Sequence, residues 1–277
     1  MGTMHLLTLP IITLLVLLGS LAGFLAGLLG IGGGIILVPL FLWVFSTAGF
    51  HPEVIVHLAF GTSLAIILPT AISSTLGHRK RGNVDWHQVL YLSIGAALGA
   101  VAGASAAAGL SGEWLKVAFG AMQILVALKM YFLHPHLPPE RGNQVPVYAL
   151  LLVGLTGGAF SAFFGVGGGV IAVPLMVIVL QLPIHLAVGN SSALIVVSAF
   201  TGALSYTLHG LGNAQLPPYS LGYVNVLVAF LVAPFTILLA RLGVRVAGRV
   251  SNDRLRYIFA AVLLIIGLRM IVKNLYF

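Results

Sequence analysis

The sequence predicts an all-α polytopic membrane protein built from two inverted repeats of five hydrophobic segments. Three observations indicate this class: the composition, a series of ten apolar segments, and a glycine-rich motif that occurs twice. Hydrophobic residues make up 60% of the 277-residue chain and charged residues only 6%, so the chain lacks the charged surface that a soluble globule needs. The apolar runs are long and contain Leu and Ala as well as Val and Ile, which favours helices over the alternating pattern of a membrane β-barrel.

The apolar segments differ in length. Eight contain roughly 20 residues, enough for a helix to cross a bilayer. The second and seventh contain about 13 residues and, at about 1.5 Å per residue, reach only about 20 Å of a hydrocarbon core of about 30 Å. We therefore expect these two to be half-helices. The ten segments cover approximately residues 5–29, 35–47, 54–77, 86–108, 114–133, 146–164, 170–182, 185–208, 220–242 and 254–273.

A glycine-rich motif opens each short segment. Residues Gly30 to Pro39 read GIGGGIILVP, and the related stretch GVGGGVIAVP runs from Gly165 to Pro174. Glycine lowers helix stability by roughly 1 kcal/mol relative to alanine, and unpaired backbone groups in hydrocarbon cost several kcal/mol each. A glycine-opened broken helix at membrane depth is therefore expected where it lines a cavity or holds a ligand.

The repeat divides the chain into two halves. Residues 1–133 form the first five-segment membrane repeat, residues 134–145 a hydrophilic linker, and residues 146–277 the second repeat. The similarity continues beyond the glycines, because Gly61-Thr62-Ser63 corresponds to Gly189-Asn190-Ser191. Chance similarity does not explain so long a correspondence.

Basic residues indicate that the repeats are inverted. His78-Arg79-Lys80-Arg81 follows the third segment, whereas the matching loop 209–219 has no charged residue. After the fourth segment the situation reverses. Residues 110–114 carry only Glu113, and the counterpart in the second half carries five arginines, at positions 241, 245, 249, 254 and 256. By the positive-inside rule, equivalent loops then lie on opposite faces of the membrane. The sequence leaves open two arrangements: ten full spans, or eight spans plus two re-entrant pairs.

Charge and cysteine content exclude several classes. The formal net charge of +8 comes from basic residues collected in loops at segment ends, which indicates membrane orientation and not nucleic-acid binding. No cysteine is present, so disulfides and thiolate metal sites are excluded. No Lys or Arg precedes Arg79, so residues 5–29 are interpreted as a retained helix and not as a signal peptide. We expect a multi-pass protein of the cell membrane whose surroundings are the lipid bilayer.

The glycine runs are the candidate binding site. A glycine cluster that opens a helix presents free N–H groups and the positive end of the helix dipole, which together bind anions. Small hydroxyl and amide side chains nearby can donate further hydrogen bonds without placing a full charge in lipid. The predicted ligand is a small polyoxygenated anion. Alternatively, the glycines only allow close helix packing and the polar side chains only bond neighbouring helices. The candidate residues are Gly32, Gly33, Gly34, Thr62, Ser63, Gly167, Gly168, Gly169, Asn190 and Ser191.

Two prolines are candidate helix breaks. Pro39 and Pro174 lie inside the short segments, where each removes a backbone donor and leaves a carbonyl free. A simple kink is an equally good interpretation. No acidic residue lies in the middle of a segment, so the sequence offers no carboxylate for coupling transport to protons or sodium. One of the histidines near segment ends (51, 57, 185 and 209) could relay a proton. No cofactor or metal motif is present.

An enzyme and a channel are the rival functions. Ser161 or Ser191 together with His209 could serve a rhomboid-like intramembrane hydrolase. However, the chain has neither a Gly-x-Ser-x-Gly elbow nor a His-Glu-x-x-His motif. An anion channel would use the same segments without alternating access.

The doubled glycine motif resembles a known family. The paired Gly-hydrophobic-Gly-Gly-Gly-x-x-x-Val-Pro motifs at 30–39 and 165–174, with the Gly61 and Gly189 tripeptides downstream, look like the TauE/SafE family of sulfite exporters and toluene sulfonate uptake permeases. The resemblance covers nearly the whole chain. It implies a secondary transporter of the cytoplasmic membrane that carries sulfite, an organosulfonate or another sulfur-containing or organic anion. Asn190 replaces the Thr62 of the first half, so the two half-sites need not be chemically equal.

Overall fold

The computed structural model describes residues 9–29, 32–132, 145–246, 264–265 and 267–268. Most of the linker and most of the tenth segment lie outside these ranges. The elements in chain order are α2 (Leu9–Leu29), α3 (Gly34–Thr47), α4 (Pro52–Arg79), α5 (Trp86–Ala108), α6 (Gly112–Phe132), α7 (Val147–Phe164), α8 (Gly169–Ile178), α9 (Ile184–Gly210), β1 (Ser220–Leu221), β2 (Val224–Asn225) and α10 (Val226–Val246).

The helix ends follow local sequence signals. Pro52 opens α4, where its missing N–H has no intrahelical partner to lose. Asp85 caps α5 by accepting hydrogen bonds from the backbone N–H groups of His87 and Gln88. Gly165 ends α7 with a left-handed backbone.

One helix begins later than the sequence indicates. The ninth segment is helical only from Val226, because residues 220–225 form a small antiparallel hairpin. Tyr219 and Gly222 have positive φ values there, 62° and 55°, which a continuing helix cannot accommodate.

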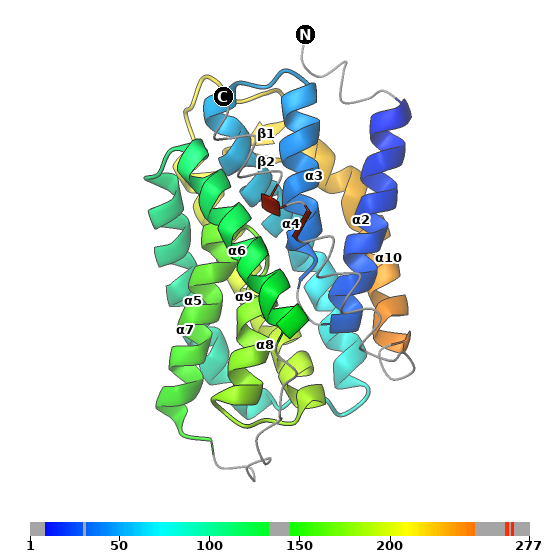
Figure 1. Ribbon diagram of the computed structural model, residues 1–277, viewed down its shortest axis with the longest axis vertical. Helices are drawn as coiled ribbons and strands as arrows, with labels where there is room; N and C mark the ends of the chain where they lie inside the picture. The colour runs from blue at the N-terminus through cyan, green and yellow to red at the C-terminus, as the bar shows by residue number, and fades with distance from the viewer. Residues whose placement is uncertain (1–8, 30–31, 133–144, 247–263, 266, 269–277) are drawn as a thin grey trace.

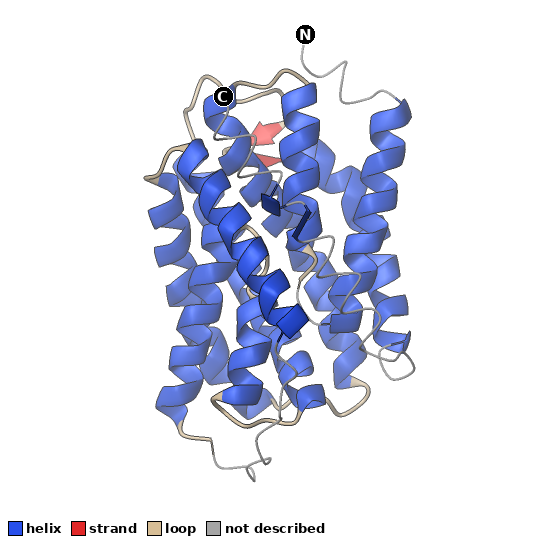
Figure 2. Cartoon of the chain, viewed as in Figure 1, coloured by secondary structure: helices blue, strands red, loops and turns tan. Residues whose placement is uncertain are grey.

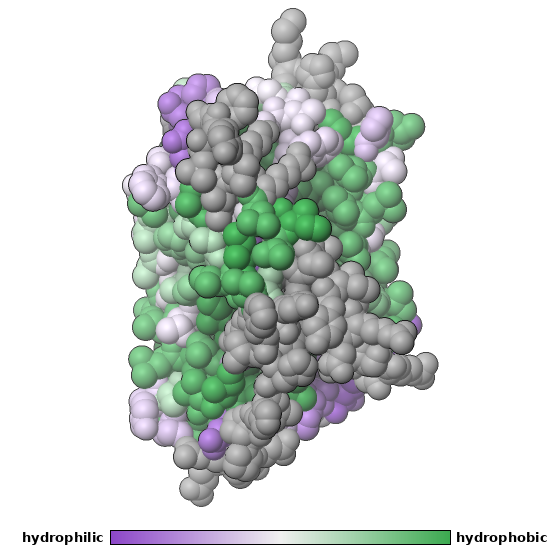
Figure 3. Space-filling model, viewed as in Figure 1, coloured by the Kyte–Doolittle hydropathy of each residue, from purple (hydrophilic) through white to green (hydrophobic). Residues whose placement is uncertain are grey.

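The helices have the length and surface of membrane spans. Six of the described helices are long and apolar enough to cross a membrane, namely α2, α4, α5, α7, α9 and α10. Where the described residues are visible in Figure 3, apolar side chains predominate between the two ends of the molecule and hydrophilic residues gather near the ends. The chain is therefore a multi-pass membrane protein. The short helices α3 and α8, with 14 and 10 residues, correspond to the two short segments.

The two longest helices occupy the centre of the bundle. α4 and α9 pack against each other in opposite directions, with α10 and α2 on the α4 side and α5 and α7 on the α9 side (Figures 1 and 2). α2 of the first half therefore packs against α10 of the second, and α7 of the second half packs against α5 of the first.

Small residues bring these helix pairs close together. Gly23 and Gly27 of α2 lie against the backbone of Thr236 and Ala240 of α10. Gly154 and Gly158 of α7 face the backbone of α5 in the same way. The absence of a side chain lets the backbones approach, as is usual for helices packed within membranes.

The chain reverses direction at each glycine run. A Cβ added at Gly33, just before α3, would lie 2.7 Å from the carbonyl oxygen of Ala22, in the middle of α2. A Cβ added at Gly168, just before α8, would likewise lie against the carbonyl oxygen of Gly157 in α7. α3 and α8 therefore start beside the middle of the preceding helix, and in Figure 1 they run toward opposite ends of the bundle.

Candidate functional site

The two glycine runs meet at the centre of the molecule. A Cβ added at Gly32 would lie 3.2 Å from the Cα of Gly167, and one added at Gly167 would lie 3.2 Å from the Cα of Gly32. Ile67 of α4 and Ile195 of α9 enclose this contact. All six glycines at 32–34 and 167–169 are buried. We call the contact between residues 32–34 and 167–169 the glycine crossing.

Both runs adopt the same backbone conformation. The φ values are 85° and 75° at Gly32 and Gly33, and 87° and 72° at Gly167 and Gly168. These left-handed values favour glycine, because other residues place Cβ too close to a carbonyl oxygen. The conformation explains why the sequence repeats glycine at these positions.

The glycine crossing presents two helix N-termini. Gly33 caps α3 and Gly168 caps α8, and neither helix has an acidic residue in its first turn. Helix N-termini carry N–H groups without intrahelical partners and a partial positive charge. The arrangement can therefore attract an anion without a charged side chain.

Thr62 and Ser63 hold loops of the second half. Ser63 Oγ donates a hydrogen bond to the carbonyl oxygen of Gly165 at 2.7 Å. Thr62 Oγ1 accepts one from the backbone N–H of Asn225 at 2.9 Å. Both hydroxyls are fully buried.

Asn190 holds a loop of the first half. Its Oδ1 accepts a hydrogen bond from the backbone N–H of Asp85 at 2.9 Å, and its Nδ2 donates to Gln88 Oε1 at 3.0 Å. Ser191 beside it is buried. Asn190 and Thr62 thus make equivalent contacts. Asn190 connects α9 to the residues just before α5, and Thr62 connects α4 to the residues just before α10.

The candidate polar residues do not form one cluster. Ser74 of α4 and Ser192 of α9 contact each other, which sets the register of these antiparallel helices. Thr62 lies twelve residues before Ser74, a distance of about 18 Å along a helix, whereas Asn190 lies two residues before Ser192. The structure therefore places Thr62 and Asn190 on opposite sides of the glycine crossing.

The sequence reasoning missed Ser74, a polar residue that lies beside the crossing. Ser74 Oγ and Ser192 Oγ lie 3.1 Å apart, and both line a cavity of about 10 Å³ together with Ala26, Gly32, Ala71 and Ile195. Such a cavity has room for about one water molecule. A signal was present, because Ser63, Thr70 and Ser74 recur at helical spacing on one side of α4.

The two prolines have different surroundings. Pro39 lies inside α3, and the carbonyl oxygen of Ile35, four residues earlier, accepts a hydrogen bond from Gln123 Nε2 of α6 at 3.2 Å. The carbonyl that Pro39 frees is thus satisfied by the protein. Pro174 lies inside α8 and lines an apolar groove.

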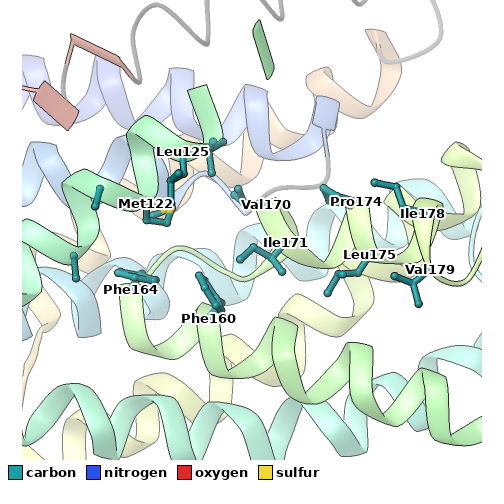
Figure 4. A pocket seen from close by; sticks show the side chains of 13 residues that line it. Met122, Leu125, Phe160, Phe164, Val170, Ile171, Pro174, Leu175, Ile178 and Val179 are labelled. Carbon is teal, nitrogen blue, oxygen red and sulfur yellow. The ribbon is translucent and has the colours of Figure 1, made fainter. Parts of the chain in front are cut away.

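That apolar groove lies between α6, α7 and α8 (Figure 4). Its volume is about 430 Å³, and Met122, Leu125, Phe160 and Val170 are among the side chains that line it. No lining side chain carries a hydroxyl, an amide or a charge. The groove offers no donor to an anion, so we place the candidate anion site at the glycine crossing.

The residues of the hydrolase alternative are not brought together as a catalytic pair. Ser161 Oγ lies 3.0 Å from Ser198 Oγ, and His209 Nδ1 lies 2.8 Å from the carbonyl oxygen of Ser205 in its own helix. His209 therefore does not act as a base toward Ser161 in this structure.

We expect loss of the Asn190 contacts to destabilise the protein. Asn190→Leu leaves the Asp85 N–H and Gln88 Oε1 without partners, which should cost about 2–4 kcal/mol. Thr62→Val, which leaves only the Asn225 N–H unpaired, should cost about 1–2 kcal/mol. The temperature at which half of the detergent-solubilised protein aggregates measures both. A smaller loss for Asn190→Leu than for Thr62→Val would contradict the assignment.

Comparisons with known proteins identify relatives of the whole chain. Residues 15–270 match the sulfite exporter TauE/SafE family. The probable membrane transporter protein YunE of Bacillus subtilis (strain 168) is 28% identical over 95% of this chain and 98% of its own length. A probable membrane transporter protein of Haemophilus influenzae is 29% identical, with coverage of 95% and 98%. The probable membrane transporter protein MJ0441 of Methanocaldococcus jannaschii is 28% identical, with coverage of 94% and 96%. No solved structure matches significantly.

Proposed function

Because the chain belongs to the sulfite exporter TauE/SafE family of membrane transporters, we propose that it carries a small anion across the cell membrane by alternating access. The proposed substrate is sulfite, an organosulfonate or another sulfur-containing oxyanion. The observation that carries the proposal is the glycine crossing, where two helix N-termini meet in the interior without any acidic neighbour in their first turns.

The proposed fold is a pair of inverted repeats. The contacts between α2 and α10 recur between α7 and α5. In this correspondence α7 lies 135 positions after α2, and α5 lies 140 positions before α10. The Cβ positions of two glycines in α2 and two in α7 support this equivalence. The contacts Gly19 to Val232 and Gly23 to Thr236 correspond to Gly154 to Leu92 and Gly158 to Ala96.

Two polar contacts are the proposed gates. Asn190 bonds the loop before α5 on one side of the crossing, and Thr62 bonds the loop before α10 on the other. The cavity beside Gly32 is about 10 Å³, too small for a polyoxygenated anion. The substrate therefore enters only after one gate opens, as alternating access requires.

A ligand screen tests the proposal. We expect sulfite, sulfate, thiosulfate, a sulfonate or a carboxylate to stabilise the purified protein by RT ln(1 + [L]/Kd), about 2.7 kcal/mol at a concentration of 100 Kd. The same anion should accelerate release of labelled anion from proteoliposomes, because a carrier exchanges substrates. A rate that does not respond to anion on the opposite side would instead indicate a channel. If no anion stabilises the protein or exchanges, the proposal is wrong.

A further inference from the structure

His78 is a buried titratable side chain that the proposed site does not use. It lies near the end of α4 and is only 3% exposed. Among the residues that the structure describes, neither of its ring nitrogens forms a hydrogen bond of normal geometry, and the nearest backbone that acts on the ring is that of Gly27. A buried imidazole without partners is costly, so this position calls for an explanation.

The position of His78 connects it to the glycine crossing. His78 follows Ser74 by four residues, so both lie on the same side of α4 with Cβ atoms about 6 Å apart. Ser74 lines the cavity beside Gly32. The His78 ring lies near the backbone of Gly27, the neighbour of the cavity-lining Ala26.

The charged groups around His78 are basic. Arg81, in the turn after α4, acts on His78 through its charge, and its guanidinium donates to the carbonyl oxygen of Val244 in α10. Arg241 of α10 donates to Ser73 Oγ at the same end of α4. α2 has no titratable side chain, and Asp85 accepts hydrogen bonds from the first turn of α5. Among the described residues, a protonated His78 would therefore be a buried cation without an acidic countercharge.

The second half has a group at the equivalent position that does not titrate near neutral pH. The alignment of Thr62 with Asn190 pairs His78 with Tyr206, and the alignment of the glycine motifs pairs Gly27 with Ala162. Tyr206 is fully buried, and its hydroxyl donates to the carbonyl oxygen of Ala162 at 3.1 Å. In the second half this position forms a hydrogen bond of normal geometry, whereas in the first half the histidine ring lies near Gly27 and forms no such bond with the described residues.

We propose that His78 is the proton-binding residue of this carrier and couples one proton to the passage of the anion. The inference rests on the proposed function. When an anion enters the cavity beside Gly32, its charge supplies the missing countercharge, and neutral His78 takes a proton from water on the same side. When the anion leaves, the imidazolium again lacks a countercharge and returns its proton to water on the opposite side. Anion and proton thus move together.

The test measures proton movement and anion movement separately in proteoliposomes. Sulfate and methanesulfonate are the probes, since both keep their charge between about pH 6 and pH 8, where histidine titrates. An inward anion gradient should acidify the lumen of wild-type vesicles, as reported by a trapped pH-sensitive dye. His78→Gln should keep exchange of labelled anion within about threefold of wild type, while the acidification falls at least about tenfold.

His57→Gln is the matched control. His57 is also buried in α4, but its Nε2 lies 3.1 Å from the carbonyl oxygen of Ala107, near the other end of the helix. This variant should retain wild-type acidification. His78→Tyr, which copies the Tyr206 arrangement, is a second variant that tests His78 if His78→Gln does not fold.

The outcomes separate the two proposals. Anion exchange without acidification in wild type, or unchanged acidification in both His78 variants, overturns the role of His78 and leaves the transport function standing. Equal loss in His57→Gln also overturns it. Wild-type vesicles that exchange none of the anions of the ligand screen overturn the proposed function, and the role of His78 with it.

Discussion

Replacement of both central glycines by alanine, Gly32→Ala with Gly167→Ala, should reduce transport roughly 100-fold. Each alanine would have a left-handed backbone, which costs about 1–2 kcal/mol, and each new methyl group would lie 3.2 Å from the Cα of the opposite glycine. If the closed structure rises in free energy by about 3 kcal/mol, its population falls roughly 100-fold. Exchange of labelled anion in proteoliposomes, normalised to the amount of folded protein, measures the effect.

Gly49→Ala is the control for backbone strain alone. Gly49 has a φ of 73°, close to that of Gly33, but a Cβ there would meet nothing within 4 Å. This variant should lose stability and keep its transport rate per folded molecule. Wild-type transport by the double variant would show that close approach of the two runs is not needed.

Gly189→Ala should open one gate and destabilise the protein by about 3 kcal/mol. Gly189 is helical, but a Cβ there would collide with the backbone carbonyl of Asn83. The loop must then move away from α9 and break the hydrogen bonds of Asn190 with Asp85 and Gln88. Overpacking of about 1–3 kcal/mol and two lost hydrogen bonds of about 1 kcal/mol each support this estimate.

Cysteine labelling can detect the opened gate, because the natural chain contains no cysteine. A cysteine in place of Ser192, beside the cavity, should react with a membrane-impermeant maleimide at least about tenfold faster in the Gly189→Ala background. Gly82→Ala, in the same loop but with nothing within 4 Å of its Cβ, should leave the rate unchanged. Equal labelling in both backgrounds would refute the gate assignment.

Hydropathy was sufficient to locate most helices. Segments expected at 86–108 and 146–164 are the helices Trp86–Ala108 and Val147–Phe164, because long apolar runs in a membrane must be helical. The hairpin at 220–225 was not predicted, because it depends on a left-handed Tyr219 that hydropathy does not report. The inverted relation of the halves stays a prediction from charge and from the repeated glycine contacts.

The candidate site was predictable only in part. The doubled glycine motif indicated both runs, and the structure brings Gly32 and Gly167 into contact. The partners of Asn190 were not predictable, because Asp85 lies more than a hundred residues away in the sequence and the repeat pattern gives no indication of this contact. Ser74 and His78 were not predicted as site residues, because their positions relative to the site depend on the packing of α4 against α9 and α2.

The exchange of partners between the halves has a consequence for how the molecule is made. Among the described helices α2 is synthesised first, and it packs against α10, which is synthesised about two hundred residues later. Contacts of such long sequence separation form slowly, since the intervening chain must first be ordered. Neither the α2–α10 pair nor the α5–α7 pair has both of its helices in one half of the chain. The described bundle is therefore completed only after α10 has been inserted. In a nascent chain halted at residue 133, α2 and α5 still lack α10 and α7, the helices against which they pack.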